Sequence, residues 1–538
     1  MSKNLSELLG RKGLNNNLFD RLGTLSKEAG SPNLEDMKKL ANEFLIGEAN
    51  VYGTVSFYDF LKEENASKKV YICNGSACMT SGTQDKLRNE LLKTYTADQI
   101  GEMSCLGRCH ENQAYHLDGK NYSGSENHHH DSYQVNHYGT QILTGSPLNI
   151  KTCIERWRSV TAQSPQSVLN EIALSGLKGR GGAGFPISIK LDACRKETSK
   201  VKYIVCNADE GDPGAYSDRY LLEQQSFSIL LGMMIAGYAA EAHFGVLYIR
   251  AEYPESIQIM REKADELMSA LQTLPNGDIY PFHFTIIKAK GAYICGEETA
   301  LINSIEGQRP EVRVRPPYPV QQGLFNKPTV INNVETLANI PWILENGGNK
   351  YATIGTSKST GTKLVSLDSH FKNPGIYEVD MGTSLDYVIN TLGDGFKNPI
   401  KALQIGGPLG GIIPIHKTYD LTIDFESFST QGFLLGHASI VSIPENFPMI
   451  CYLEHLFKFT AHESCGKCFP CRLGSMRGFE MMNRAVEQQK PINRKLLDDL
   501  LETMELGSLC ALGGGLPLPI KNALQYFESE LSTFITKK

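Results

Sequence analysis

The chain has 538 residues, a formal net charge of -6 at pH 7 and a hydrophobic fraction of 41%. This length predicts two to four domains, the composition is typical of a globular protein, and the weak charge argues against nucleic acid as a partner. The polar N-terminus lacks the apolar stretch of a signal peptide, so we expect no export and a cytoplasmic location. The longest apolar stretch, 227–240, is too short for a bilayer span, so we expect a buried core helix and no direct membrane insertion.

The first part of the chain is predicted to be helical and then α/β. Helix-period segments alternate with polar breaks from Leu5 to about Leu61. A short strand at 69–73, a helix near 84–95 and two cysteine-bearing loops then predict a compact α/β unit. Residues 121–145 are rich in Gly, Ser, His and Tyr, and we interpret them as a linker or exposed excursion rather than a strand pair.

The remainder alternates helices and strands again from Ser164, which predicts a multidomain α/β protein. Strands are expected at 202–206, 245–251 and 284–289, with helices between them. Residues 362–422 are rich in glycine and β-branched residues and predict a small β-rich domain. Helices are expected again towards the C-terminus.

Thirteen cysteines are many for an intracellular protein, and their clustering is more informative than their number. Eight of them fall in two groups of four. The other five are scattered and are expected to be ordinary buried thiols: Cys153, Cys194, Cys206, Cys295 and Cys451.

The first cysteine group consists of two close pairs. Four residues separate Cys73 from Cys78, and three separate Cys105 from Cys109. Zinc sites more often use a C-x2-C spacing, so a zinc site or four unrelated structural cysteines are the alternatives. The wider gaps, filled mostly by small residues, favour a two-iron cluster, whose thiolates must reach two metals.

The segment before these pairs, 51–58, reads VYGTVSFY. Together with the two pairs it resembles the thioredoxin-like 2Fe-2S subunit of respiratory complex I. The resemblance implies a helical bundle followed by a cluster domain, with the four paired cysteines as ligands. A histidine run at 128–130 lies where that family has no site, and we interpret it as a solvated loop rather than a metal site.

A glycine-rich loop, GLKGRGGAGFP at 176–186, is a candidate anion cradle. Glycines allow main-chain N–H groups to approach an anion closely, and Arg180 and Lys190 would add charge. A flexible connector is an equally ordinary interpretation, because no clean strand precedes the loop as the G-x-G-x-x-G fingerprint requires.

Three further polar segments lie in otherwise apolar surroundings, at 207–213, 293–299 and 331–336. The first follows a predicted strand directly, and ligands of α/β proteins bind at such strand ends. The alternative is local: Glu297 and Glu298 would complement a helix N-terminus, and the Asn pair of the last segment would cap a helix.

Taken together, the four segments closely resemble, in order, the flavin- and NADH-binding subunit of complex I and of soluble NAD-reducing hydrogenases and formate dehydrogenases. The resemblance implies FMN as cofactor. The implied FMN contacts are Gly179, Arg180, Gly181, Gly182, Lys190, Asn207, Asp209, Glu210, Gly296, Glu297, Glu298, Ile331, Asn332, Asn333 and Thr336. The implied NADH contacts are Phe185, Asp212, Tyr293, Glu298, Arg315 and Tyr318, where Phe185 and Tyr318 offer planar faces for adenine.

The chain also departs from the family pattern at the nucleotide site. Arg315 and Tyr318 stand where the family usually has Lys and Phe, which preserves the charge and the ring. Asp212 replaces a common Glu, and 191–193 reads Leu-Asp-Ala where the family carries aromatics. The last difference predicts a weaker adenine sandwich and a less certain preference for NAD over NADP.

The second cysteine group contains the spacing C-x2-C-x2-C, with a distant fourth cysteine. Three thiolates on one tight turn plus a remote fourth suit a cubane 4Fe-4S cluster, whereas a zinc ribbon would show two separated pairs. The same family carries this motif in a C-terminal helical domain. The implied ligands are Cys465, Cys468, Cys471 and Cys510.

Between the flavin segments and this motif lies a second glycine-rich stretch, 406–411. It resembles a nucleotide loop, but the family has a β-grasp domain here, so we expect a structural role. The expected domains are a helical bundle (1–65), a thioredoxin-like 2Fe-2S domain (66–145), an FMN/NADH domain (146–360), a β-grasp domain (361–440) and a helical 4Fe-4S domain (441–538).

The fusion of both parts in one chain is similar to the diaphorase subunit of cytoplasmic NAD-reducing [NiFe] hydrogenases. This resemblance implies hydride exchange between NAD(H) and FMN, then single-electron exchange with the clusters. No nucleophile or acid–base pair is found, and Glu210 and Glu298 are expected to support the transfer. The implied partners are a ferredoxin-like iron–sulfur subunit and the hydrogenase small and large subunits. Alternatives are the flavin subunit of a formate dehydrogenase, an electron-bifurcating complex or complex I, and a non-catalytic redox scaffold.

Overall fold

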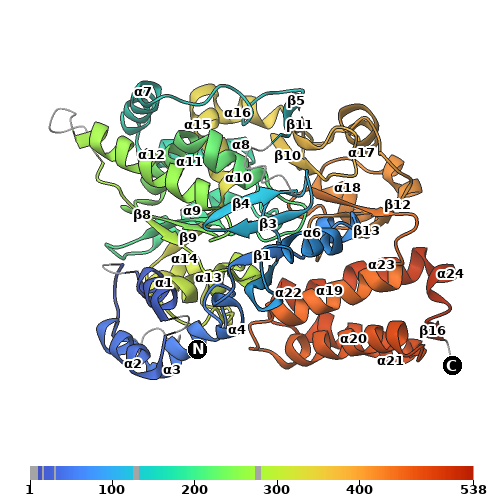
Figure 1. Ribbon diagram of the computed structural model, residues 1–538. Helices are drawn as coiled ribbons and strands as arrows, with labels where there is room; N and C mark the ends of the chain where they lie inside the picture. Colours follow the sequence, from blue (N-terminus) through green and yellow to red (C-terminus); the bar gives the residue numbers. More distant parts are fainter. Residues whose placement is uncertain (1–9, 15–16, 30–31, 125–131, 273–279, 537–538) are drawn as a thin grey trace.

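The computed structural model describes residues 1–538 except 1–9, 15–16, 30–31, 125–131, 273–279 and 537–538. The described chain forms three larger β-sheets with helices around them, an N-terminal group of helices and a C-terminal helical region with a two-stranded sheet (Figure 1). The predicted α/β class is confirmed. The five domain boundaries proposed from the sequence stay a prediction.

The N-terminal helices pack against residues 164–346, which contain the four polar segments and are called the flavin-side region. Tyr58 donates a hydrogen bond to Ser304 Oγ at 2.6 Å, and both side chains are buried. Asn33 caps the second helix, because its side chain accepts the N–H of Asp36 at 2.9 Å. The helices are α1 (Leu18–Ala29), α2 (Leu34–Glu43), α3 (Glu48–Val55) and α4 (Glu63–Ala66).

The first sheet lies near the centre of the view in Figure 1 and has the order β2-β1-β3-β4. Its first two strands are parallel and the other pairings are antiparallel. The predicted strand and helix of this unit are confirmed. The elements are β1 (Val70–Cys73), α5 (Ser76–Thr80), α6 (Gln84–Leu91), β2 (Ile100–Met103), β3 (Ala114–Leu117) and β4 (Lys120–Ser123).

The interpretation of 121–145 as a linker is wrong for two segments. Strand β4 pairs with β3, and a further strand, β5 (Gln134–Tyr138), pairs in parallel with β11 (Gly375–Asp380) far along the chain. Strand β5 lies at the edge of its sheet with most of its side chains exposed, so it shows no apolar alternation. The histidine run at 128–130 lies outside the described residues.

The second sheet is parallel throughout, with the order β8-β7-β6-β9. Its inner strands read as nearly continuous apolar runs because helices cover both faces. The strands are β6 (Tyr203–Ala208), β7 (Phe244–Ile249), β8 (His283–Lys288) and β9 (Thr329–Asn333). The main helices are α8 (Pro165–Ser175), α9 (Ile187–Lys196), α10 (Ser217–Gln224), α11 (Ser226–Ala240), α12 (Pro254–Gln272), α13 (Glu298–Ile305) and α15 (Val334–Asn346).

Helix α11 contains the longest apolar stretch of the sequence and is buried along nearly its whole length, which confirms the predicted core helix. Among the described helices, none combines the length and the apolar character needed to cross a bilayer.

The third sheet has the order β13-β12-β14-β10-β11-β5 and confirms the predicted β-rich region. The glycines of 406–411 turn the chain between β12 (Ile400–Ile405) and β13 (Ile412–Pro414); Gly406 and Gly407 both have left-handed φ values. The β-grasp assignment stays a prediction. The remaining strands, besides β5 and β11, are β10 (Thr362–Leu367) and β14 (Ser439–Pro444).

The C-terminal region is helical, as predicted, and lies at the lower right of Figure 1. A short parallel pairing of β15 (Ile492–Asn493) with β16 (Ile535–Thr536) joins the end of this region to the loop before α21. The helices are α19 (Met449–Glu463), α20 (Phe469–Glu487), α21 (Arg494–Gly507), α22 (Ala511–Gly515), α23 (Pro517–Tyr526) and α24 (Glu528–Leu531).

Candidate functional site

The first cysteine group converges at the end of the first sheet. Cys73 ends β1, Cys78 lies in α5, and the other pair lies in the loop after β2; all four side chains are buried. The Sγ atoms of Cys105 and Cys109 are 3.6 Å apart. Four buried sulfurs gathered from two loops match the donor set that an iron–sulfur cluster requires.

Each pair of thiols in this group favours one thiolate, because the hydrogen bonds that lower the pKa of Cys73 and Cys105 raise the pKa of Cys78 and Cys109. The hydrogen bond with the Cys78 thiol lowers the pKa of Cys73 to about 7, and the N–H groups of Gly75 and Leu106 act in the same direction against burial. N–H groups aimed at sulfur stabilise the negative charge that a metal-bound thiolate carries.

The flavin-side region closes over the first group. Gly214 N–H donates to Cys109 Sγ at 3.2 Å, and Arg219 donates to the Gly107 carbonyl at 2.9 Å. Gly107 has a φ of 68°, and a Cβ there would lie 2.6 Å from the ring of Tyr253. The loop between Cys105 and Cys109 therefore fits against its neighbour only with glycine at this position.

The second cysteine group lies where α19 ends and α20 begins. Cys468 is the N-cap residue of α20, and Gly466, with a φ of 82°, provides the turn before it. Cys465 and Cys471 are buried, whereas Cys468 and Cys510 are partly exposed.

The thiols of this second group are electrostatic neighbours. Burial raises the pKa of Cys471 to about 11, and Cys468 and Cys465 add to the shift. Burial raises the pKa of Cys510 to about 12, with contributions from Glu297 and Cys465. The distant fourth cysteine of the sequence motif is thus brought to the other three, and Glu297 of the flavin-side segment lies within its electrostatic reach.

The polar segments of the flavin-side region meet at the carboxyl ends of β6 and β9. Asn207 donates to the Gly296 carbonyl at 2.8 Å, which joins the first segment to the second. Asn332 Nδ2 is buried and has no hydrogen-bond partner within the described part of the chain. A Cβ on Gly181 would lie 2.9 Å from Asn333 Cβ, so the glycine loop packs directly on the third segment. A polar cofactor such as FMN would supply a hydrogen-bond partner for the buried amide of Asn332 beside the glycine loop.

Glu297 and Asn333 act as helix caps, which is the alternative role expected for these segments from the sequence. Glu297 accepts the N–H groups of Thr299 and Ala300 at the start of α13, at 2.9 and 2.8 Å. Asn333 accepts the N–H of Glu335 at 2.9 Å at the start of α15. Both caps hold the polar segments in place, and their contacts with FMN stay a prediction.

Two of the basic residues pair with Glu298, and the third is buried in the fold. Lys190 Nζ lies 3.1 Å from Glu298 Oε2, and Arg315 Nη1 lies 3.0 Å from Glu298 Oε1. The Arg180 side chain is buried and donates to the Thr362 carbonyl at 3.0 Å. The guanidinium is held by main-chain carbonyls of the β-rich region, and the prediction that Arg180 contacts the cofactor stays a prediction.

Of the acidic residues after β6, Asp209 and Glu210 are buried and Asp212 is partly exposed. Glu210 accepts the N–H of Asp218 at 2.9 Å and the Tyr253 hydroxyl at 2.9 Å. Burial raises the pKa of Glu210 to about 7, and the carboxylate of Asp218 adds to the shift. Asp212 Oδ1 accepts the hydroxyl of Tyr293 at 2.7 Å, and burial raises the pKa of Asp209 well above its usual value.

Sequence reasoning missed His437, which lies just before β14. Its Nε2 is 3.4 Å from Asp218 Oδ2 and 3.6 Å from Glu210 Oε1. Burial opposes its charge, but the carboxylate of Asp218, assisted by Glu210, raises the pKa of His437 to about 9. No local pattern marks this histidine, because its partners come from a segment more than 200 residues away.

The aromatic residues expected at the nucleotide are accessible. Phe185 is 45% exposed and Tyr318 is 54% exposed, so both rings are free to stack on a planar ligand. After Lys190, Leu191 is buried and Asp192 pairs with Lys196 at 2.5 Å. These two residues supply no ring to the site.

A direct contact joins the flavin-side region to the second cysteine group. The N–H of Tyr293 donates to Glu463 Oε2 at 2.8 Å, two residues before Cys465. The ring of Tyr293 packs edge-on against Phe459 of α19, with centroids 5.0 Å apart. Segments far apart in the sequence therefore meet beside the cluster cysteines.

Four of the five scattered cysteines are buried, as predicted, and the prediction is wrong for Cys451, which is partly exposed. Burial raises the pKa of both Cys153 and Cys194 to about 12. Cys206 and Cys295 are also buried.

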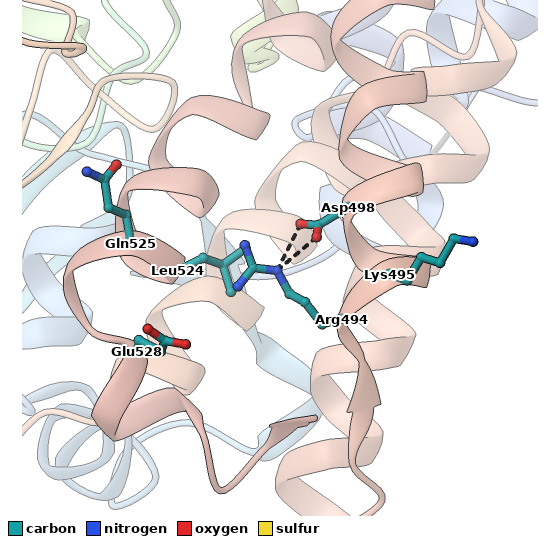
Figure 2. A pocket seen from close by; sticks show the side chains of 6 residues that line it. All are labelled: Arg494, Lys495, Asp498, Leu524, Gln525 and Glu528. Carbon is teal, nitrogen blue, oxygen red and sulfur yellow. Dashed lines mark hydrogen bonds and ion pairs between the residues drawn. The ribbon is translucent and has the colours of Figure 1, made fainter. Parts of the chain in front are cut away.

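A surface hollow of about 610 Å³ lies in the C-terminal region, away from these sites (Figure 2). Most of its lining residues are charged, and Arg494 Nε lies 2.9 Å from Asp498 Oδ1. It contains neither a cysteine nor an aromatic face, so we assign no cofactor to it. The lining residues are Arg494, Lys495, Asp498, Leu524, Gln525 and Glu528.

Comparisons with known families match three parts of the chain. The thioredoxin-like [2Fe-2S] ferredoxin family matches 13–132, the Nuo51 FMN-binding domain matches 172–342, and the NADH-ubiquinone oxidoreductase-F iron–sulfur binding region matches 452–533. Each match covers one of the sites described above.

Individual relatives agree with these matches. The NADP-reducing hydrogenase subunit HndC of Solidesulfovibrio fructosivorans is 40% identical over 385 residues, which cover 70% of this chain and 78% of the relative. The mitochondrial NADH dehydrogenase [ubiquinone] flavoprotein 1 of Dictyostelium discoideum is 36% identical over 374 residues, covering 68% of this chain and 78% of the relative. A chain of the NAD+-reducing [NiFe]-hydrogenase solved in the H2-reduced state has a TM-score of 0.86 at 27% identity, covering 97% of this chain and 93% of that chain.

The relatives are subunits of hydrogenases or of NADH dehydrogenases. The matched regions account for a flavin and for both iron–sulfur clusters. The chain therefore belongs to the Nuo51-type flavoprotein family, as an NADH:acceptor oxidoreductase subunit in which the FMN-binding part is fused to a thioredoxin-like 2Fe-2S ferredoxin.

Proposed function

We propose that the chain is the diaphorase subunit of a cytoplasmic NAD-reducing [NiFe] hydrogenase. The likeness to the solved hydrogenase chain extends over 97% of this chain, whereas the flavoprotein of Dictyostelium discoideum aligns with 68% of it. The fused 2Fe-2S part is therefore shared with the hydrogenase chain. The partners in this proposal are a ferredoxin-like iron–sulfur subunit and the hydrogenase small and large subunits.

The observation that carries the proposal is the junction at Tyr293. Its main chain is bonded to Glu463 beside the second cysteine group, and its hydroxyl is bonded to Asp212 of the proposed nucleotide site. One residue thus spans from the nucleotide side to the cluster side. This junction brings the two sites close together, as electron transfer between them would need.

When bound, FMN would accept hydride from NADH and release the two electrons singly. In this proposal Asn207 and Asn332 hold the flavin at the ends of β6 and β9, and Lys190 and Glu298 orient polar groups at its edge. The exposed rings of Phe185 and Tyr318 seat the adenine of NADH. Glu210, which is buried just after β6, supports the hydride transfer.

We propose two sets of cluster ligands from the grouping of the sulfurs. The enclosed group would hold the 2Fe-2S cluster as a side store for electrons, and the partly exposed group would hold the 4Fe-4S cluster. The ligands are Cys73, Cys78, Cys105 and Cys109 for the first, and Cys465, Cys468, Cys471 and Cys510 for the second.

The surface beside the second group supports a protein partner there. Phe469, Leu473 and Met476 form an exposed apolar stripe along α20, which starts just after Cys468. Exposed Leu506 belongs to the end of α21, and a Cβ on the adjacent Gly507 would lie 2.8 Å from Pro470. An apolar stripe next to partly exposed cluster cysteines suits the docking of an electron-transfer subunit.

Two tests separate this proposal from its alternatives. Titrating the purified chain with NADH should bleach the visible flavin absorbance, and the absence of bleaching would leave the non-catalytic redox scaffold. Hydrogen-dependent reduction of NAD+ by the co-purified complex should then be observed. If formate, but not hydrogen, supports NAD+ reduction, the formate dehydrogenase alternative is correct; reduction only with a quinone-linked or ferredoxin-linked complex points to the other two.

A further inference from the structure

A small cavity lies where four parts of the chain meet. Its volume is about 10 Å³, at the lower limit of the space that a single water needs. Its lining includes Asp59 between α3 and α4, Ser104 of the first cysteine unit, Asp209 and Glu252 of the flavin-side region, and Glu463 of α19. The cavity therefore adjoins the surroundings of all three proposed redox sites.

Three buried polar atoms on this cavity lack a hydrogen-bond partner among the described residues: Ser104 Oγ, Asp209 Oδ2 and Glu252 Oε2. Buried polar groups are almost always paired, and a buried water typically makes about three hydrogen bonds. Arg250 stabilises the wall of the cavity, because it donates to Glu252 Oε1 at 2.9 Å and to the Ser104 carbonyl at 3.2 Å.

Asp59 connects the cavity to the protein surface through His462. Its Oδ1 lies 2.9 Å from Lys62 Nζ and 3.2 Å from His462 Nε2. The side chain of His462 is 51% exposed, whereas Asp59 is buried. A proton that reaches Asp59 is thus one hydrogen bond from a solvent-accessible imidazole.

We propose that the cavity holds one ordered water, and that this water connects Asp209 to Asp59 and His462 as a path for the proton that NADH oxidation releases and NAD+ reduction consumes. The inference rests on the proposed function and on Asp209 as one of the implied FMN contacts. Oxidation of NADH to NAD+ yields two electrons and one proton. Because the electrons leave through the clusters, the proton needs a route of its own.

The charges around the path favour transfer inwards, from Asp59 to Asp209. Burial raises the pKa of Asp209 well above its usual value, so Oδ2 binds a proton tightly. The pKa of Asp59 is lowered despite burial, because His462 and Lys62 stabilise its carboxylate, so Asp59 gives up a proton easily. This direction is the one that NAD+ reduction needs, and the release of the proton on NADH oxidation follows the same path in reverse. The titratable and charged groups facing these two carboxyls are Tyr58, Lys62, Tyr71, Tyr248, Arg250, Glu252, Cys295, His462 and Glu463.

The decisive experiment measures proton release and flavin absorbance together. The flavin-loaded chain is mixed with NADH and a one-electron acceptor in weak buffer containing a pH indicator. Asp59→Asn should slow proton release by about tenfold or more, the range of a lost proton-transfer group, while NADH still bleaches the flavin. An added small base such as imidazole should restore the rate, which a merely structural defect would not allow.

Two further variants keep the test decisive. His462→Gln changes the half-exposed end of the path and should also slow proton release, even if Asp59→Asn fails to fold. Asp20→Asn, an exposed acid in α1, is the matched control and should leave the rate unchanged. Wild-type proton release in both path variants, or slow release that imidazole does not restore, would overturn the path. Absence of bleaching in the unaltered chain would instead contradict the proposed function.

The water itself is tested by a crystal structure. A solvent peak within hydrogen-bond distance of Asp209 Oδ2, Ser104 Oγ and Glu252 Oε2 is expected. A dry cavity, or a peak with the shorter contacts of a metal ion, would contradict the inference.

Discussion

The two cysteine groups differ in how the rest of the chain surrounds them. The first is fully buried, and the flavin-side region closes over it through Gly214 and Arg219. The second has two partly exposed members and lies beside an apolar stripe on α20. Enclosure is appropriate for a site that stores electrons within the chain, and exposure is appropriate for a site that passes them to a partner.

Removing one ligand from each group is the largest perturbation of this comparison. Cys471→Ser should abolish electron transfer from NADH to the partner subunit, because the proposed exit cluster is lost. Cys73→Ser should remove the 2Fe-2S signal but leave most of that transfer, because the enclosed cluster is a side store. Electron paramagnetic resonance and the NADH-driven assay measure both effects. Equal losses of transfer in the two variants would contradict the assigned roles.

Matched glycine substitutions compare the packing of the two cysteine loops. Gly107 and Gly466 both have left-handed φ values, but a Cβ would lie 2.6 Å from Tyr253 in the first case and 3.8 Å from its nearest neighbour in the second. Gly107→Ala should lower stability by about 1–3 kcal/mol through overpacking in addition to strain. Gly466→Ala should cost about 1 kcal/mol, from backbone strain alone. Thermal unfolding of the two variants measures the difference, and equal shifts would show that the first loop is less enclosed than described.

Solvent access should distinguish the clusters in the unaltered protein. Treatment with a mild oxidant and a chelator should destroy the 4Fe-4S cluster several-fold faster than the 2Fe-2S cluster, because only the second group has partly exposed cysteines. The two clusters are followed by their separate spectroscopic signals during the treatment. Faster loss of the 2Fe-2S signal would reverse the comparison.

The buried charge of His437 should make the stability of the protein depend modestly on pH. The neighbouring carboxylates raise the pKa of His437 from 6.5 to about 9 in the folded state, so its contribution is fully present below pH 6.5 and is lost as the pH rises to about 9. The thermal midpoint should fall over this range, and His437→Gln should reduce the fall. Glu210, whose pKa burial raises to about 7, contributes below that pH, and loss of His437 raises its pKa further, so the two proteins are compared between pH 7 and 9. A fall of the same size in the variant would show that His437 is not charged in the folded state.

Local pattern predicted a large part of this protein. The cysteine spacings, the glycine loop and the order of the polar segments were sufficient to identify the family, because each is a short run of residues whose chemistry does not depend on distant neighbours. The core helix and the parallel strands followed from continuous apolar runs. In contrast, β5 was missed, since an exposed edge strand carries no apolar alternation and is defined only by its pairing with β11.

What the sequence by itself determined is which groups the chain possesses and in which order. Only the tertiary structure decided which of them meet. It directed the Arg180 guanidinium into the fold, brought His437 between Glu210 and Asp218, and placed Asp59 and Asp209 on one cavity. These outcomes depend on packing between segments hundreds of residues apart, and the free energy of that packing is not encoded in any local spacing.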